Sequence, residues 1–310
     1  MTKSFSIICA LVTTFIWGTA FIAQDTGMDN IGPLTFNAAR FLVGFLTVLP
    51  FALWLERKKI FKQIQLDKKK FFKYLTIMGV SLFLGTSLQQ TSLQYTNVAN
   101  AAFFTVFYVP LVPILLFLIY SQKVHWSIWP SIGLCIYGVY LLSNFSNTEI
   151  MMGDGLVILC SLFWALHIIF AGKFMEIFDI PIFYAAMQAM LVTILSFFFA
   201  YIFEDIIFSD ILLESYSIIY AGVLSGGIAF TLQMFAQKNI EEAPAAIIYS
   251  LEGVFAVIAA WIILDQILNL NNIITCILIL LAVIFSQTRL ANDSSVVPCR
   301  MIWCSILLKF

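Results

Sequence analysis

The sequence predicts an all-α membrane protein with ten transmembrane helices, arranged as two inverted five-helix repeats. Three observations predict it: the apolar content, the distribution of positive charge and an internal repetition. Hydrophobic residues make up 62% of the 310 residues and charged residues 11%, against about 25% in soluble proteins. No soluble core could hide so much apolar surface, and a disordered chain would be far less apolar. The net charge of −1 leaves no basic face for nucleic acid.

Ten apolar runs lie between charged or turn-forming interruptions. A transmembrane helix needs about 20 mostly apolar residues, and a lipid-exposed backbone must satisfy its own hydrogen bonds, so each run is predicted to be a helix. Runs such as 111–120 and 273–284 do not alternate in polarity as the strands of a membrane barrel do. The fifth, sixth and tenth runs are short. The runs are 5–23, 34–55, 71–93, 98–120, 127–142, 155–171, 182–203, 217–236, 243–264 and 273–285.

Positive charge predicts the orientation. If the amino terminus is cytoplasmic, the inside segments hold every one of the 16 lysines and arginines except Arg40, which lies within a predicted helix. The outside loops carry acids instead. One missed helix would swap every later loop, so this division favours ten spans, with both termini cytoplasmic and the chain in the cytoplasmic (inner) membrane. The first run has no A-x-A-like cleavage site after it and is expected to be a retained span.

The chain also repeats itself weakly. Residues 15–18 (FIWG) resemble 162–165 (LFWA), and residues 98–102 (VANAA) resemble 242–246 (EAPAA). Five helices per half is an odd number, so the second half enters the membrane from the opposite side, as in the inverted repeats of secondary transporters. We therefore expect one five-helix repeat over residues 1–145, a second over 146–290 and a cytoplasmic tail over 291–310.

These motifs resemble the drug/metabolite transporter superfamily, and within it the EamA-type transporters. The residues that carry the resemblance are 17–21 (WGTAF), Arg40-Phe41 after Pro33, 99–102 (ANAA), and 245–246 (AA) followed by 250–256 (SLEGVFA). Gly253 stands where that last motif usually has proline, which puts a local kink in doubt. The resemblance implies a carrier of small metabolites, often an exporter, without a bound cofactor.

Two charges, Arg40 and Glu252, fall well inside predicted helices. A charge at the bilayer centre costs at least about 2.5–3.5 kcal/mol, so each needs a partner or water. At about 1.5 Å per residue, the two differ in depth by roughly 7 Å in a core about 30 Å thick. Two interpretations stay open: a substrate or proton site, or a structural ion pair that locks the two halves together.

Other intramembrane residues join them as candidates for substrate binding or coupling. Two tryptophans at matching positions can flank a substrate or bind a cation through their π faces, although core packing explains them equally well. The single mid-helix histidine can titrate near neutral pH or serve as a hydrogen-bonded packing residue. When the two halves are aligned, Tyr108 corresponds to Glu252 and Gln188 corresponds to Arg40. These further candidates are Trp17, Trp164, Tyr108, His167, Gln90, Gln188 and Tyr249.

A secondary transporter fits these features better than two alternatives. An intramembrane enzyme would need a constellation such as H-E-x-x-H, and a channel would need a ring of selective ligands. There is no P-loop for direct ATP use. We expect a non-enzymatic exporter or exchanger that moves a small metabolite, such as an amino acid, by alternating access. Proton coupling through Glu252 and exchange without a titrating group both stay open, and the oligomeric state is not predicted.

The cysteines and the tail complete the predictions. The 6 cysteines are scattered without a CxxC pair, so neither a metal site nor a disulfide framework is expected. Residues 296–310 are apolar but too short to span the bilayer. They are interrupted by Pro298, Arg300 and Lys309, so we expect them to lie on the cytoplasmic surface as an interfacial segment anchored by Trp303.

Overall fold

The structure is a computed structural model that describes residues 2–96, 98–126, 128–143, 152–263 and 270–288, and every regular element in these ranges is helical. The all-α prediction is confirmed there. Eight stretches are long and apolar enough to cross a membrane, and two shorter apolar helices accompany them. The eight are Lys3–Thr26, Pro33–Leu55, Lys68–Ser92, Asn100–Tyr120, Met152–Ile177, Pro181–Phe203, Ser215–Ala236 and Glu242–Ile263.

All ten predicted runs coincide with helical segments. The elements are α1 (Lys3–Thr26), α2 (Pro33–Leu55), α3 (Arg57–Leu66), α4 (Lys68–Ser92), α5 (Val98–Thr105), α6 (Tyr108–Tyr120), α7 (Ile128–Ser143), α8 (Met152–Ile177), α9 (Pro181–Phe203), α10 (Phe208–Leu213), α11 (Ser215–Tyr220), the π-helix η1 (Ala221–Ala229), α12 (Phe230–Ala236), α13 (Glu242–Tyr249), α14 (Leu251–Ile263) and α15 (Leu270–Thr288). The sixth run is not short, because α8 has 26 residues. The short helices α3 and α10 were not predicted from the sequence.

Local chemistry explains where several helices begin. Pro33 and Pro181 occupy the first positions of α2 and α9, where a missing N–H costs nothing and the fixed φ suits a helix. The Asp67 side chain accepts a hydrogen bond of 3.0 Å from the Lys70 amide and caps α4. This cap separates α4 from the short charged helix α3 before it.

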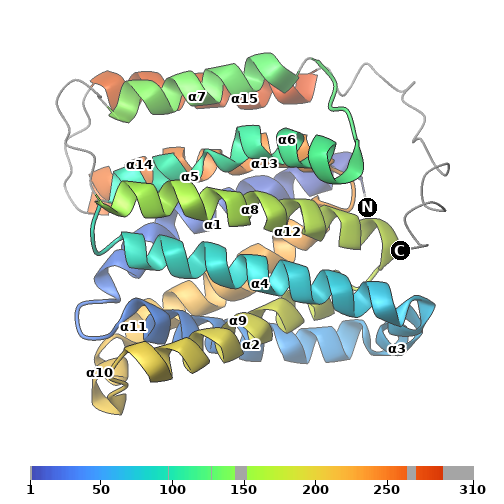
Figure 1. Cartoon of the computed structure of the whole chain (residues 1–310), viewed down its shortest axis with the longest axis vertical. Coiled ribbons are helices and arrows are strands. Elements are labelled where there is room, and N and C mark those ends of the chain that lie inside the picture. Colours follow the sequence, from blue (N-terminus) through green and yellow to red (C-terminus); the bar gives the residue numbers. More distant parts are fainter. Residues whose placement is uncertain (1, 97, 127, 144–151, 264–269, 289–310) are drawn as a thin grey trace.

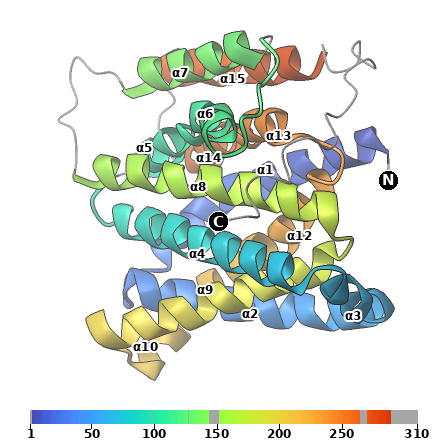
Figure 2. The ribbon, with the colours of Figure 1, turned by 45° about the vertical axis from the view of Figure 1, so that its right-hand side comes forward.

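The helices pack as a stack of layers (Figures 1 and 2). α2 lies beside α9 at one edge of the stack, and α7 lies beside α15 at the other. Between them, α4 packs on α8, while α1 packs on α14 and on the continuous segment of η1 and α12. The core between these layers is made mostly of aliphatic and aromatic side chains.

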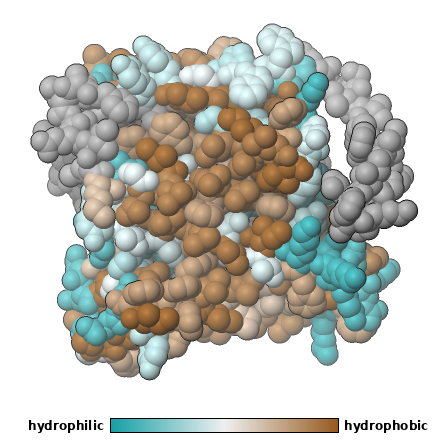
Figure 3. Space-filling view, in the orientation of Figure 1, coloured by the Kyte–Doolittle hydropathy of each residue, from teal (hydrophilic) through white to brown (hydrophobic). Residues whose placement is uncertain are grey.

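Hydrophilic residues gather at the two sides where the helices end, and a hydrophobic face lies between them (Figure 3). The side that carries the amino terminus and α3 holds Lys3, the lysines of α3 and Lys238, and we call it the basic side. The opposite side, with Asp29, α10 and Glu214, is called the acidic side. Exposed residues such as Phe197 and Leu46 cover the surface between them, as expected for contact with lipid.

Two glutamates join α2 to α9. The Glu56 carboxylate, just after α2, accepts hydrogen bonds from the amides of Ile182 (3.2 Å) and Phe183 (2.7 Å) at the start of α9. The Glu204 carboxylate, just after α9, accepts hydrogen bonds of 2.8 Å from the amides of Leu34 and Thr35 at the start of α2. Each carboxylate satisfies amides that a helix start leaves unpaired, so the two helices are fastened at both ends.

Glycines bring α2 and η1 into backbone contact. A Cβ atom added to Gly44 would lie 2.8 Å from the carbonyl carbon of Gly226, and one added to Gly222 would lie 2.7 Å from the Arg40 oxygen. Gly222 and Gly226 have the G-x-x-x-G spacing, whose small residues let helix backbones approach closely. The predicted tail at 296–310, its anchor Trp303, and Cys299 and Cys304 lie outside the described residues.

Candidate functional site

Two of the membrane helices are interrupted near the middle of the stack. The first breaks between α5 and α6, where Pro110 lacks the N–H that would bond to the Val106 oxygen, and the Val109 amide bonds to it instead at 2.9 Å. The second breaks at Ser250, between α13 and α14, without a proline. There the Gly253 amide turns to the Ser250 oxygen at 3.3 Å, so the interruption exists although Gly253 replaces the proline of the motif.

A narrow cavity lies between α1, α2, α4, α8, η1, α12 and α14. Its volume is about 20 Å³, which is room for about one water molecule rather than for a substrate. Gln24 and Gln89 lie near the ends of α1 and α4 on the acidic side, so the cavity occupies that half of the stack. It is lined by Trp17, Phe21, Gln24, Arg40, Thr86, Gln89, Trp164, Ser225, Phe230 and Glu252.

Arg40 reaches the cavity from α2 and is only 2% exposed. Its Nε donates a hydrogen bond of 2.8 Å to the Asn37 side chain, one helical turn earlier. The guanidinium also lies over the Phe41 ring, 4.9 Å from its centroid. In the described part of the chain its terminal nitrogens have no carboxylate partner. The guanidinium is therefore oriented by its neighbours but not neutralised by them.

Glu252 reaches the same cavity from the first turn of α14 and is 6% exposed. The Tyr108 hydroxyl lies near its carboxylate but outside hydrogen-bonding geometry. Within the described ranges, no salt bridge joins Glu252 to Arg40. The structural ion pair considered from the sequence is therefore not formed in this conformation, because the two side chains line the cavity without meeting.

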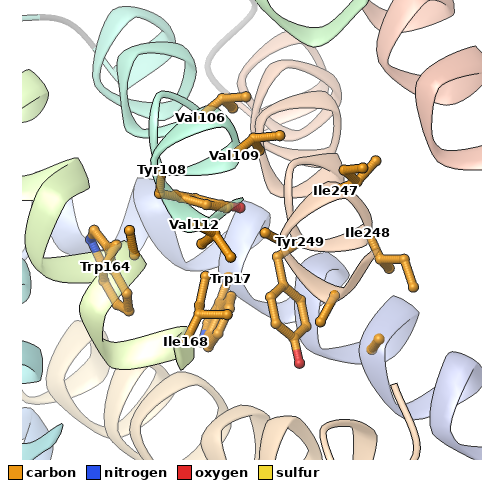
Figure 4. Close-up of a cluster of buried hydrophobic side chains, with 14 of the residues drawn as sticks. Trp17, Val106, Tyr108, Val109, Val112, Trp164, Ile168, Ile247, Ile248 and Tyr249 are labelled. Atoms are coloured by element: carbon orange, nitrogen blue, oxygen red, sulfur yellow. The ribbon is translucent and has the colours of Figure 1, made fainter. Parts of the chain in front are cut away.

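Aromatic rings form a floor below the cavity, toward the basic side. The Trp17 ring lies between those of Trp164 and Tyr249, with centroid distances of 5.9 and 5.6 Å (Figure 4). The Phe230 ring stacks on Trp164 at 6.2 Å with an interplanar angle of 5°. The structure thus brings the two tryptophans of the repeated motif into contact, and we call the rings of Trp17, Trp164 and Phe230 the aromatic floor.

Five other candidates from the sequence do not line the cavity. The Gln90 side chain turns away from the cavity and donates a hydrogen bond of 2.7 Å to the main-chain oxygen of Gln24, while its neighbour Gln89 faces the cavity. His167 and Gln188 bond to each other at 2.9 Å. Tyr108 and Tyr249 are fully buried beside the lining residues.

Sequence reasoning missed several lining residues. Phe21, Gln24, Thr86, Ser225 and Phe230 carry no charge and belong to no motif that the sequence analysis interpreted as a site. The only signal for Ser225 was its place among the closely spaced glycines of the eighth run. Ser225 lies in the π-helix η1, and the wider turns of π-helices often occur at functional sites.

An ionic cluster lies on the basic side. Lys59 of α3 donates a hydrogen bond of 2.7 Å to the Asp179 carboxylate between α8 and α9, and Lys238, before α13, donates to the other oxygen. Burial alone would raise the pKa of Asp179, but the hydrogen bonds from Lys238 and Lys59 outweigh it and hold that pKa below the usual 3.8. Three segments far apart in the sequence are thereby joined.

The fold and the cavity define a helical membrane protein with a buried, charged central site. Residues 4–144 and 151–288 match the EamA-like transporter family, and the chain belongs to that family. It is 31% identical over 278 residues to an uncharacterized transporter of Archaeoglobus fulgidus, covering 90% of this chain and 84% of the relative. It is 23% identical over 276 residues to the uncharacterized transporter YoaV of Bacillus subtilis, covering 86% and 91%.

A solved crystal structure shares the fold. It superposes with a TM-score of 0.75 over 95% of this chain and 100% of that chain, at 13% sequence identity. At this identity the likeness concerns the fold alone.

Proposed function

We propose that this transporter moves a small zwitterion, such as an amino acid, across the cytoplasmic membrane as an exporter or exchanger that works by alternating access. One observation carries the proposal. Arg40 and Glu252 are opposite charges, both buried, that line one cavity without neutralising each other.

A zwitterion supplies the missing partner of each charge. The planar guanidinium of Arg40 suits a carboxylate, which it can bind through two parallel hydrogen bonds. The Glu252 carboxylate suits an ammonium group. Since an unpaired charge inside a membrane protein is costly, a ligand that pairs both is favoured over one that pairs a single charge. The aromatic floor offers further contact to the apolar part of the ligand or to its cation.

Aromatic packing toward the basic side supports alternating access. The aromatic floor lies between the cavity and the cluster of Phe71, Phe174, Phe178 and Tyr184, whose rings pack within 4.7–6.3 Å of one another in the pairs Phe71–Phe174, Phe71–Phe178, Phe71–Tyr184 and Phe174–Phe178. With a volume of about 20 Å³, this cavity has no room for a substrate in the present conformation. We infer that this conformation is a nearly occluded state that opens toward the acidic side and closes toward the basic side.

Reciprocal contacts support the proposed inverted repeat of ten helices. Glu204 follows Glu56 by 148 residues. Glu56, at the end of α2, caps the start of α9, and Glu204, at the end of α9, caps the start of α2. Likewise Gln90 donates to the Gln24 oxygen, and Gln237, 147 residues later, donates to the Ile168 oxygen at 2.8 Å. Corresponding side chains thus make similar bonds in the two halves, although the Ile168 acceptor lies about one helical turn from the position that corresponds to Gln24. The basic residues on the side of the amino terminus support a cytoplasmic orientation for that side.

The test is flux in membrane vesicles with matched solutes. A panel would contain neutral amino acids, the amines that lack their carboxylate and the acids that lack their amine, each with and without a pH gradient. We expect saturable transport and counterflow for the amino acids, which a channel would not show. Arg40→Gln should lose about tenfold or more in transport of amino acids relative to the amines, and Glu252→Gln relative to the acids, as expected when one charged hydrogen bond is removed.

Glu241→Gln is the matched control, because Glu241 is an exposed acid whose side chain makes no helix-capping bond. It should transport like the unmodified protein. Transport that is unchanged in both cavity variants, or equal rates for amino acids and their singly charged analogues, would contradict a zwitterion site. Dependence of uptake on the pH gradient that Glu252→Gln abolishes would favour proton coupling over exchange.

A further inference from the structure

A second group of polar side chains lies beneath the aromatic floor. His167 of α8, Gln188 of α9 and Gln233 of α12 are each 0% exposed. His167 Nε2 and Gln188 Oε1 are 2.9 Å apart. None of the three lines the cavity that holds Arg40 and Glu252. We call them the inner polar group.

Contacts along α12 place Gln233 at the height of the other two. Phe230, three residues before it, lies against Trp164 and His167, and Gln237, one turn after it, bonds to the Ile168 oxygen. Since residues three and four apart share a helix face, Gln233 faces α8 between these two contacts. The inner polar group therefore gathers on the basic side of the floor.

Most of its hydrogen-bonding capacity is unused. His167 Nδ1, Gln188 Nε2 and both amide atoms of Gln233 have no partner within the described ranges. Buried polar atoms without partners are rare in folded proteins and each is costly. Packing does not explain three such side chains together, because leucine or methionine would fill the same space without unpaired atoms.

Two rings of the aromatic floor, Phe230 and Trp164, separate His167 from the cavity, since Trp164 also lines the cavity and meets His167 edge-on at a centroid distance of 5.9 Å. Phe230 lines the cavity, stacks on Trp164 and meets His167 edge-on at a centroid distance of 5.7 Å. The two polar regions also occupy related positions in the chain. Gln188 follows Arg40 by 148 residues, and Gln233 follows the cavity residue Thr86 by 147. The inner group thus corresponds to part of the cavity, with a neutral amide in place of the charged guanidinium.

We infer that His167, Gln188 and Gln233 form a second binding station on the path, which takes the uncharged hydrogen-bonding groups of a small polar solute after the rings of Phe230 and Trp164 move aside. The inference rests on the proposed transport function. An imidazole and two primary amides offer both donors and acceptors to carbonyl, amide and hydroxyl groups. Because it lacks the guanidinium of the outer cavity, this station holds a carboxylate less tightly than the cavity does, as suits a site that a solute passes between the basic side and the cavity.

Thiol labelling tests whether water reaches the station. Gln233→Cys and Gln188→Cys would be treated with a charged, membrane-impermeant methanethiosulfonate in vesicles that expose the basic side, located by an amino-terminal tag. We expect labelling above that of the unmodified chain, and none from the acidic side. The control is Ile194→Cys, a position on α9 that is 51% exposed on the apolar surface and should stay unlabelled. Absence of labelling at both amide positions would overturn the inference, whether or not any solute is transported.

Transport from each side tests whether the station binds. Gln233→Leu should raise the KM measured from the basic side roughly tenfold, equivalent to about 1.4 kcal/mol, and leave the KM from the acidic side unchanged. Gln233→Met serves if the leucine variant does not fold. Equal changes on both sides, or labelling without a change in KM at the basic side, would show that these side chains bind nothing and would overturn the station. If the unmodified chain moves no amino acid, the proposed substrate fails while the labelling result still stands.

Discussion

Glu56 and Glu204 cap each other's helices. The carboxylate at the end of α2 accepts two amide hydrogen bonds from the start of α9, and the carboxylate at the end of α9 accepts two from the start of α2. One contact lies on the basic side and the other on the acidic side. The pair α2–α9, at the edge of the stack, is thereby held at both ends.

These caps predict two comparable losses of stability. Glu56→Ala and Glu204→Ala should each lower the free energy of unfolding by about 0.5–2 kcal/mol, the usual effect of losing a helix cap. Thermal unfolding in detergent measures the loss. Asp205→Ala is the control, since Asp205 is an exposed acid next to Glu204. If Asp205→Ala loses as much stability as Glu204→Ala, the cause is the removal of a negative charge and not the loss of the helix cap.

The separation of Arg40 and Glu252 predicts how their effects combine. Because no salt bridge joins them, the stability losses of Arg40→Gln and Glu252→Gln should add in the empty protein to within about 0.5 kcal/mol. An amino acid should raise the melting temperature of the unmodified chain and of neither variant, since the ligand bridges both charges. If the double variant were more stable than either single variant, Arg40 and Glu252 would instead form a buried ion pair in the unmodified protein.

Gly18 predicts a steric effect on the cavity. A Cβ atom there would lie 2.7 Å from the main-chain carbonyl oxygen of Glu252 and 2.8 Å from the Ala256 amide nitrogen. Gly18→Ala must therefore push α14 away from α1. We expect a loss of about 1–3 kcal/mol in stability, typical of overpacking, and slower transport. Gly155→Ala is the matched control, because a Cβ at Gly155 meets nothing within 4 Å. If the two alanine variants have the same stability and transport rate, α1 and α14 can move apart at little cost.

Asp179 predicts a pH dependence. Its pKa is lowered in the folded protein by the hydrogen bonds from Lys238 and Lys59, so the charged carboxylate contributes stability above its usual pKa of 3.8. That contribution is lost as the pH falls through the lowered pKa. The unmodified chain should therefore melt at a higher temperature than Asp179→Asn at pH 7, and the difference should vanish in strong acid. A difference independent of pH would assign the effect to packing.

Much of the helical framework could be predicted from the sequence, for a physical reason. In lipid the backbone must bond to itself, so long apolar runs have little choice but to form helices, and all ten runs did so. Arg40 and Glu252 stood out for a related reason, since charges are costly among apolar residues. Both proved to line the cavity.

The lining itself depended on helix rotation. Gln89 and Gln90 are neighbours with the same side chain, yet one faces the cavity and the other bonds to the Gln24 oxygen. Adjacent helical residues point about 100° apart, and only the packing of α4 against its neighbours decides which of them points inward. Ser225 and Phe230 escaped notice for the same reason, because nothing in their own chemistry sets them apart.

The sequence by itself thus determined the class of protein, the positions of its helices and the two buried charges, because the cost of polar groups in lipid depends on composition along the chain. Only the tertiary structure decided that Trp17 meets Trp164, that Glu56 and Glu204 reciprocally cap α9 and α2, and that Arg40 and Glu252 share a cavity without touching. These are relations between helices far apart in the sequence, and side-chain packing sets them.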